Sequence, residues 1–163
     1  MNSGEAAQFK IEAIGEIITP YAEKFAIPHQ AQAVKEVEGY IRLFSKYADE
    51  SAIRGLEGFS HLWLIWLFSE IEEGYFSPMV RPPRLGGNKK VGVFASRSPF
   101  RPNRLGLSLV KLNEIKKIDG ETRILISGVD MLSRTPLIDI KPYVPFDLAE
   151  EPCFSWAEGE KAE

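Results

Sequence analysis

The chain has 163 residues, of which 44% are hydrophobic and 26% charged, and its formal net charge is −3, which is typical of one soluble globular domain. Its longest apolar run, Leu62–Phe68, is far shorter than the roughly 20 residues that a membrane-spanning helix needs. The single cysteine, Cys153, excludes an intramolecular disulfide, and two separated histidines form no metal-ligand cluster. We therefore expect a cytoplasmic protein without a metal and without a membrane segment.

The first half of the chain contains three strand-like segments. Apolar and charged residues alternate with a period of two in Phe9–Ile18 and again in Val37–Phe44, as in half-buried strands. Lys46–Arg54 is expected to form a short helix. His61–Phe68 is a continuous aromatic and β-branched run, which suits a strand that is covered on both faces.

The second half contains three more strands and two proline-rich loops. The predicted strands are Val91–Ala95, Leu105–Ile115 and Arg123–Val129, and the loops are Ser77–Lys90 and Ser96–Arg104. Short strands separated by such turn signals predict a mostly β fold, in the form of a single small β-barrel, or a sandwich, with short helices and proline-rich loops. Because strands do not alternate with long amphipathic helices, a doubly wound parallel sheet is not expected.

The domain is expected to cover residues 1–146, followed by an acidic C-terminal tail over residues 147–163. The segment Phe146–Glu158 is predicted either to dock as a helix or to stay mobile.

Charge is distributed unevenly along the chain. Ser77–Lys117 contains ten basic residues and one acid, Glu114, whereas the segments before and after it each sum to −6. A segment of one sign is a candidate anion-binding face despite the negative net charge. The alternative interpretation is a solvated basic loop.

Several common cofactor and catalytic motifs are absent. The sequence has no G-x-G-x-x-G after a strand, no P-loop spacing and no G-x-S-x-G elbow. A cofactor would therefore need a different binding architecture from the dinucleotide-type cradle.

One arginine-rich loop stands out, between Ala95 and Gly106. It holds Arg97, Arg101 and Arg104 within eight residues, and two prolines restrict its backbone. Preorganised guanidinium groups suit a phosphate or a carboxylate. The other interpretation is a rigid turn whose arginines pair with acids of the same protein.

Three further residues are candidates for proton transfer or ion pairing. Asp130 follows the last predicted strand, and Asp139 and Lys141 are two positions apart in an extended segment, so that both side chains point to one face. That pair is either an ion pair facing a cleft or an ordinary surface pair. His61 is either a base or a structural histidine. The tryptophans Trp63 and Trp66 are expected in the core.

These segments together resemble the TsaA-like family, whose bacterial members are tRNA methyltransferases. The resemblance spans about Phe9 to Phe146 without large gaps. Its matching blocks are Lys24–Gln30, Arg54–Trp63, Val80–Asn88, Gly92–Gly106 and Thr135–Phe146. It implies a small barrel that binds S-adenosylmethionine and dimerises. It also implies methylation of the exocyclic amino nitrogen of threonylcarbamoyl-adenosine, next to the anticodon of threonine tRNA.

The resemblance also implies site residues. The cofactor pocket should draw on Gln30, Ala31, Gln32, Ala33, Ser69, Glu70, Arg97, Leu107, Gly128, Val129, Asp130 and Met131. The base that removes a proton from the nucleophilic nitrogen should be Asp130, Asp139 or His61. Phosphates of the tRNA should meet Arg81, Arg84, Arg101, Arg104 and Lys141.

Three positions depart from the family pattern. His29 stands where arginine is usual, Arg134 stands where glycine is usual in a turn, and Arg104 stands where proline is common. Arginine accepts a positive φ less readily than glycine, so the turn at Arg134 is expected to differ. Bacterial members also carry a further C-terminal domain outside the range of the match. Binding of tRNA by the barrel alone is therefore less expected than binding of the cofactor.

Two alternatives to an enzyme follow from these departures. The first is a non-catalytic barrel that binds S-adenosylmethionine or RNA, and the second is an oligomeric β-scaffold whose arginines are structural.

Overall fold

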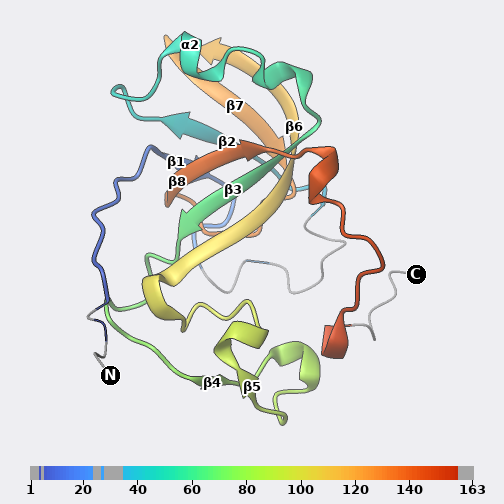
Figure 1. The fold of residues 1–163 in the computed structure, drawn as a ribbon. Coiled ribbons are helices and arrows are strands. Elements are labelled where there is room, and N and C mark those ends of the chain that lie inside the picture. The colour runs from blue at the N-terminus through green and yellow to red at the C-terminus, as the bar shows by residue number, and fades with distance from the viewer. Residues whose placement is uncertain (1–3, 5, 24–26, 28–34, 158–163) are drawn as a thin grey trace.

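The molecule is built around one antiparallel sheet that closes on itself (Figure 1). In this computed structural model, residues 4, 6–23, 27 and 35–157 are described. Each strand pairs with two neighbours in the order β1-β2-β7-β6-β3-β8, and β8 pairs back to β1. The strands are β1 (Gly15–Ile18), β2 (Glu38–Leu43), β3 (His61–Leu67), β6 (Leu105–Ile118), β7 (Glu121–Ser127) and β8 (Thr135–Pro142). The predicted mostly β class is confirmed, and the strand order closes as a barrel requires.

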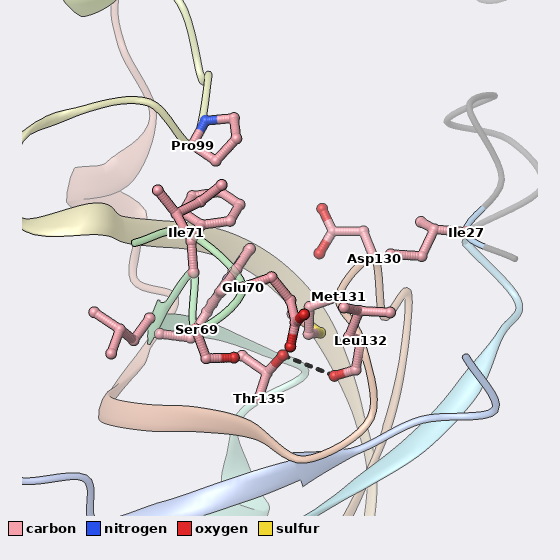
Figure 2. Close-up of a pocket in the computed structure, with 12 residues that line it drawn as sticks. Ile27, Ser69, Glu70, Ile71, Pro99, Asp130, Met131, Leu132 and Thr135 are labelled. Carbon is pink, nitrogen blue, oxygen red and sulfur yellow. Dashed lines mark hydrogen bonds between the residues drawn. The ribbon is translucent and has the colours of Figure 1, made fainter. Parts of the chain in front are cut away.

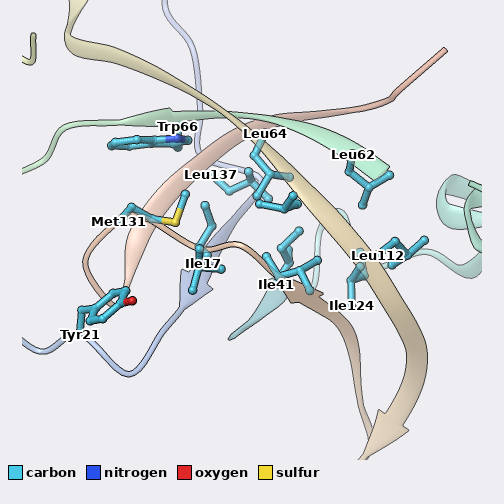
Figure 3. Close-up of a cluster of buried hydrophobic side chains, with 13 residues drawn as sticks. Ile17, Tyr21, Ile41, Leu62, Leu64, Trp66, Leu112, Ile124, Met131 and Leu137 are labelled. Carbon is cyan, nitrogen blue, oxygen red and sulfur yellow. The ribbon is translucent and has the colours of Figure 1, made fainter. Parts of the chain in front are cut away.

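The core lies inside the closed sheet and comes from alternate residues of its strands (Figure 3). The fully buried side chains include Ile17, Ile41, Leu62, Leu64, Ile124, Ile126 and Leu137. Aliphatic side chains at every second position give each strand one apolar face, and closure of the sheet buries these faces together.

Strand β3 shows where the sequence interpretation needed correction. Its pattern is regular alternation, with Leu62, Leu64 and Trp66 buried and the side chains between them partly exposed. We expected both faces of this strand to be covered, but only the inner face is buried and the outer face is partly exposed. Trp63 belongs to the outer face, where its indole N–H donates to Asp147 at 2.9 Å, so its placement in the core was wrong.

Strand β6 continues into β7 through a tight hairpin. Asp119 and Gly120 have φ values of 53° and 81°, the left-handed backbone that a two-residue hairpin turn requires. The hairpin makes β6 three residues longer than predicted, and β7 begins two residues earlier. At the other end of the chain, only Gly15–Ile18 of the predicted strand Phe9–Ile18 pairs in the sheet.

A long excursion, the β3–β6 connection (residues 68–104), lies at one end of the sheet (Figure 1). It carries the short pair β4 (Met79–Val80) and β5 (Val91–Gly92) and several 3-10 turns. The predicted strand Val91–Ala95 is strand only for two residues, because Val93–Ala95 turns as a 3-10 helix. Val80 and Val93 are buried and give the connection a small apolar core.

The remaining elements are short. Helix α2 (Glu50–Ile53) lies inside the predicted helix, and Asp49 caps it by accepting from the backbone N–H of Ser51 at 2.8 Å. In the C-terminal segment, the indole N–H of Trp156 donates to the carbonyl of Ala95 at 2.9 Å, which holds residues 155–157 against the β3–β6 connection. No helix in the described part of the chain has the length and apolar character that crossing a membrane requires.

Candidate functional site

A pocket opens where the end of β3, the β7–β8 loop and the β3–β6 connection meet (Figure 2). Its walls surround about 510 Å³ of space, part of which is open to solvent. Its walls are mostly apolar, with a few polar groups. The lining residues are Ile27, Trp66, Leu67, Phe68, Ser69, Glu70, Ile71, Pro99, Asp130, Met131, Leu132 and Thr135.

The polar centre of the pocket is a hydrogen-bonded chain from the sheet interior to its mouth. The indole N–H of Trp66 donates to Ser108 Oγ at 3.0 Å, and Ser108 Oγ–H donates to Asp130 Oδ1 at 2.7 Å. Trp66 and Ser108 are 7% and 4% exposed. Gly106 makes room for this arrangement, because a Cβ at Gly106 would lie 2.5 Å from Cζ2 of the Trp66 ring.

The donor and the acceptor of each hydrogen bond in the series Trp66–Ser108–Asp130 follow from the chemistry of the groups. An indole N–H only donates, so Ser108 must accept from Trp66, and the one hydroxyl proton of Ser108 is left for Asp130. Oδ1 of Asp130 is therefore an acceptor and carries no proton in this arrangement. If Asp130 takes up a proton, that proton resides on Oδ2.

Desolvation raises the pKa of Asp130 above its ordinary value, although the residue as a whole is exposed at the pocket mouth. The hydrogen bond from Ser108 and the positive charge of Arg97 lower this pKa again, but only in part. Desolvation, followed by the charge of Asp130, also raises the pKa of Tyr21. A carboxyl group with a raised pKa at the mouth of a pocket is a candidate general base.

The loop that carries Asp130 is fixed by contacts with the segment after β1. Thr19 Oγ1–H donates to the carbonyl of Met131 at 3.0 Å, and the N–H of Ser133 donates to the carbonyl of Tyr21 at 2.8 Å. Arg134 has a φ of 65°. This value lies in the left-handed region, which an arginine adopts less readily than a glycine.

The predicted cofactor residues differ in where they lie relative to the pocket. Ser69, Glu70, Asp130 and Met131 line the pocket. Val129 is fully buried in the core beside it, and Gly128, with a φ of 90°, turns the chain out of β7. Arg97 is exposed and acts on Asp130 through its charge. Leu107 is 45% exposed on the outer face of β6 and does not line the pocket, and Gln30, Ala31, Gln32 and Ala33 lie outside the described residues.

Two of the three candidate bases lie away from the pocket. His61 begins β3, five residues and therefore about 16 Å along the strand from Trp66. There its Nδ1 lies 2.9 Å from Ser60 Oγ, and its ring packs edge-on against Tyr143. Asp139 forms an exposed ion pair with Lys141 at 2.9 Å, so this pair is the ordinary surface pair of the two interpretations. Of the three, only Asp130 lines the pocket.

Two arginines of the loop, Arg101 and Arg104, donate to backbone carbonyls. Arg101 donates to the carbonyls of Val93 and Ser96 at 3.0 to 3.2 Å, and Arg104 donates to the carbonyl of Ile71 at 2.5 Å. Neither guanidinium pairs with an acid of the described chain in these contacts, and both hold the β3–β6 connection together. Arg104 has a φ of 53°, which proline cannot adopt. Arg81 and Arg84 are exposed.

Sequence reasoning missed several residues of the site, above all Trp66 as a donor and Ser108 as its acceptor. One signal was present. Inward positions of β6 are Gly106, Ser108, Val110 and Leu112, and a serine and a glycine in an otherwise apolar series mark a place where another group approaches.

The structure thus defines a class: a small antiparallel protein with a closed sheet, an apolar pocket beside it and a desolvated carboxyl group at the pocket mouth. Within this class, residues 16–147 match the model of the tRNA-methyltransferase O N-terminal domain. The chain belongs to this family.

Individual relatives agree with this assignment. The chain is 48% identical over 140 residues to the tRNA (adenine(37)-N6)-methyltransferase of Escherichia coli strain K12, a match that covers 86% of this chain and 60% of that protein. It is 39% identical over 146 residues to a probable S-adenosyl-L-methionine-binding protein of Pyrococcus abyssi, covering 89% and 74%.

Solved structures show the same fold. A crystal structure of TrmO from Pseudomonas aeruginosa superposes with a TM-score of 0.73 at 33% identity, over 93% of this chain and 64% of that one. The chain spans 55% to 60% of the length of the first curated relatives it matches.

Proposed function

We propose that this chain is the S-adenosylmethionine-dependent methyl-transfer domain of a tRNA-modifying enzyme. Its target is the exocyclic amino nitrogen of the adenine next to the anticodon, in the form of threonylcarbamoyl-adenosine of threonine tRNA. The name of the Escherichia coli relative supports the reaction class. The observation that carries the proposal is Asp130, whose carboxyl group Ser108 holds at the pocket mouth with a raised pKa.

The pocket residues fit S-adenosylmethionine by their chemistry. Met131, Leu132 and Ile71 give apolar walls for the adenine ring and the methyl group. The carboxyl groups of Glu70 and Asp130 suit the cationic end of the cofactor or its ribose hydroxyl groups, and Arg97 suits its carboxylate. When bound, S-adenosylmethionine supplies an electrophilic methyl group. Gln30 to Ala33, Gly128 and Val129 are proposed to complete this site.

Asp130 acts as the general base in this proposal. The exocyclic nitrogen is a weak nucleophile because its lone pair is delocalised into the purine and the adjoining carbonyl group. Asp130 accepts the proton that this nitrogen loses, on Oδ2, since Oδ1 is occupied by the hydroxyl proton of Ser108. A raised pKa makes Asp130 a stronger base than an ordinary aspartate. The hydrogen bond from Ser108 to Oδ1 also fixes the orientation of the carboxyl group, and therefore the position of Oδ2.

The pocket walls contribute alignment and exclusion of water. Trp66 packs edge-on against Phe68 with 4.3 Å between ring centroids, and this pair forms one rigid wall of the pocket. A rigid apolar wall restricts the orientations of a bound methyl donor and nucleobase. Such alignment of the reacting atoms is the main way in which a protein accelerates an in-line displacement.

We also propose that the chain forms a homodimer through the outer face of β6. Leu105, Leu107 and Leu109 are 36%, 45% and 40% exposed and point outward at every second position. Ile65 and Leu67 of β3 lie beside them as cross-strand partners of Leu107 and Leu105. An apolar stripe across two strands is typical of a buried interface. A cytoplasmic location is part of the same proposal, because tRNA is its partner.

The test is mass spectrometry of threonine tRNA that already carries the threonylcarbamoyl group, after incubation with S-adenosylmethionine and the protein. A gain of one methyl group in wild type and none in Asp130→Asn is expected. Asp139→Asn is the matched control, because it removes the same charge from a surface ion pair, and it should keep activity.

Isothermal titration separates the alternatives. Cofactor binding without methyl transfer would replace the proposal by a non-catalytic binding protein. Absence of heat at millimolar cofactor would overturn the cofactor assignment itself.

A further inference from the structure

The β3–β6 connection exposes aromatic side chains that the pocket does not use. Phe94 is 78% exposed, Tyr75 50%, Phe76 47% and Phe100 36%. Tyr75 and Phe100 pack edge to face, with 5.6 Å between ring centroids and an interplanar angle of 77°, so the two rings are not stacked face to face. Exposed aromatic rings of this kind seldom gather on a protein surface without a partner.

These rings stand on a backbone that is held rigidly. The N–H of Ser77 donates to the carbonyl of Phe100 at 3.1 Å, and the N–H of Val93 donates to the carbonyl of Pro78 at 3.0 Å. Arg101, the neighbour of Phe100, donates to the carbonyl of Val93, the neighbour of Phe94. The three segments that carry the rings are therefore parts of one unit.

The charge over most of this connection is positive. Between Ser77 and Arg104 the sequence has seven Lys and Arg residues and no Asp or Glu. Five of these basic residues are exposed: Arg81, Arg84, Lys89, Lys90 and Arg97. Aromatic rings for base stacking together with cations for phosphates form the usual surface for single-stranded nucleic acid.

The surface also adjoins the pocket. Pro99 and Ile71 line the pocket, and the residue after Pro99 is Phe100. A polynucleotide whose target base enters the pocket would therefore pass its neighbouring nucleotides over Phe100 and Tyr75.

We propose that the aromatic and basic surface of the β3–β6 connection, formed by Tyr75, Phe94, Phe100 and the exposed cations of the same connection, binds the unpaired bases of an RNA loop by stacking. This inference rests on the proposed tRNA partner and adds the surface and the mode of recognition. Stacking on these rings is a different contact from the phosphate binding expected of Arg101 and Arg104. The guanidinium groups of those two arginines donate to the protein's own carbonyls.

The experiment measures binding of a fluorescent anticodon stem–loop RNA, and of a blunt duplex with the sequence of its stem, by anisotropy at several salt concentrations. The variants are Phe94→Ala and Phe100→Ala. Phe146→Ala is the matched control, because Phe146 is a 95% exposed phenylalanine outside the connection. Phe94 is so exposed that its loss is not expected to disturb folding, and circular dichroism checks this for each variant.

Each aromatic variant should weaken stem–loop binding about 5- to 100-fold, while binding of the duplex and the Phe146→Ala control change little. The slope of log affinity against log salt should stay that of wild type, because these substitutions remove no cation that binds a phosphate. Lys89→Ala with Lys90→Ala should instead make that slope shallower, by about 0.7 for each phosphate that the protein no longer neutralises.

Three results would overturn the inference. They are wild-type affinity in both aromatic variants, equal binding of stem–loop and duplex, and no measurable stem–loop binding by the unaltered chain. A change of sedimentation coefficient in Phe94→Ala without loss of RNA affinity would assign the surface to contact between two copies of the chain instead. None of these assays needs cofactor or turnover, so failure of methyl transfer with intact stem–loop binding leaves this inference standing.

Discussion

Removal of one hydroxyl group, in Ser108→Ala, tests the structure of the site most directly. Ser108 is 4% exposed, and its hydroxyl oxygen is the acceptor for the buried indole N–H of Trp66. The substitution leaves that N–H without this acceptor, and it deprives Asp130 Oδ1 of its donor. Stability and the protonation of Asp130 should therefore change together.

The magnitude follows from the two broken hydrogen bonds. A buried donor without a partner costs about 1–3 kcal/mol, so we expect a loss of about 2 kcal/mol in the free energy of unfolding. For a chain of this length that corresponds to a fall of roughly 4–8 °C in Tm. The pKa of Asp130 should rise further, because the Ser108 hydrogen bond favours its charged form.

The assay is a double-mutant cycle with Trp66→Phe, which removes the indole N–H and keeps an aromatic ring. Ser108→Ala should cost about 1 kcal/mol less in the Trp66→Phe background, because no buried N–H is left unpaired there. In parallel, carbon NMR should show the Asp130 carboxyl titrating at higher pH in Ser108→Ala, and the acid limb of the methyl-transfer rate should move the same way.

Equal costs of Ser108→Ala in both backgrounds would refute the indole hydrogen bond. An unchanged Asp130 titration would refute the hydrogen bond from Ser108 to Asp130, and with it the positioning role of Ser108.

Four further substitutions have defined outcomes. Gly106→Ala should destabilise by about 1–3 kcal/mol in chemical denaturation, because its Cβ would overlap the Trp66 ring. Asp130→Asn should stabilise the fold at neutral pH. The pKa of Asp130 is raised in the folded protein, so ionisation of this carboxyl group costs the wild type stability as pH rises above the ordinary carboxyl range. Near pH 3 Asp130 is protonated in both states, and the stability gained by the substitution should vanish. Arg134→Gly should stabilise by about 1 kcal/mol, since Arg134 has a φ of 65°, and wild-type Tm in this variant would contradict the cost of that conformation. Leu107→Arg should convert the proposed dimer to monomers in sedimentation analysis. Ser45→Arg, at an exposed turn position away from β6, should not.

Apolar patterns located β2, β3, β6 and β7 to within a few residues, by alternation in β2 and by a continuous apolar run in β3. These patterns did not predict β8 (Thr135–Pro142) as a strand. The prediction also failed at Val91–Ala95, because Val93–Ala95 forms a 3-10 turn that the hydrogen bond from the N–H of Ser96 to the carbonyl of Val93 closes. The guanidinium of Arg101 donates to the same carbonyl at 3.2 Å, and the periodicity of a strand does not reveal this contact.

The sequence also placed Asp130 among the candidate bases, but with Asp139 and His61 as equals. The three differ only in their neighbours. Asp139 pairs with Lys141 on the surface, His61 packs on Tyr143 at the far end of β3, and Asp130 meets Ser108 beside the pocket.

The amino-acid order by itself therefore determined the mostly β class, the inward positions of the strands and the basic character of the β3–β6 connection, all of which depend on residues close in sequence. Closure of the sheet decided the rest, because it brings together Trp66, Ser108 and Asp130, which are 42 and 22 positions apart. Desolvation and hydrogen bonding of a carboxyl group depend on neighbours that only this closure supplies.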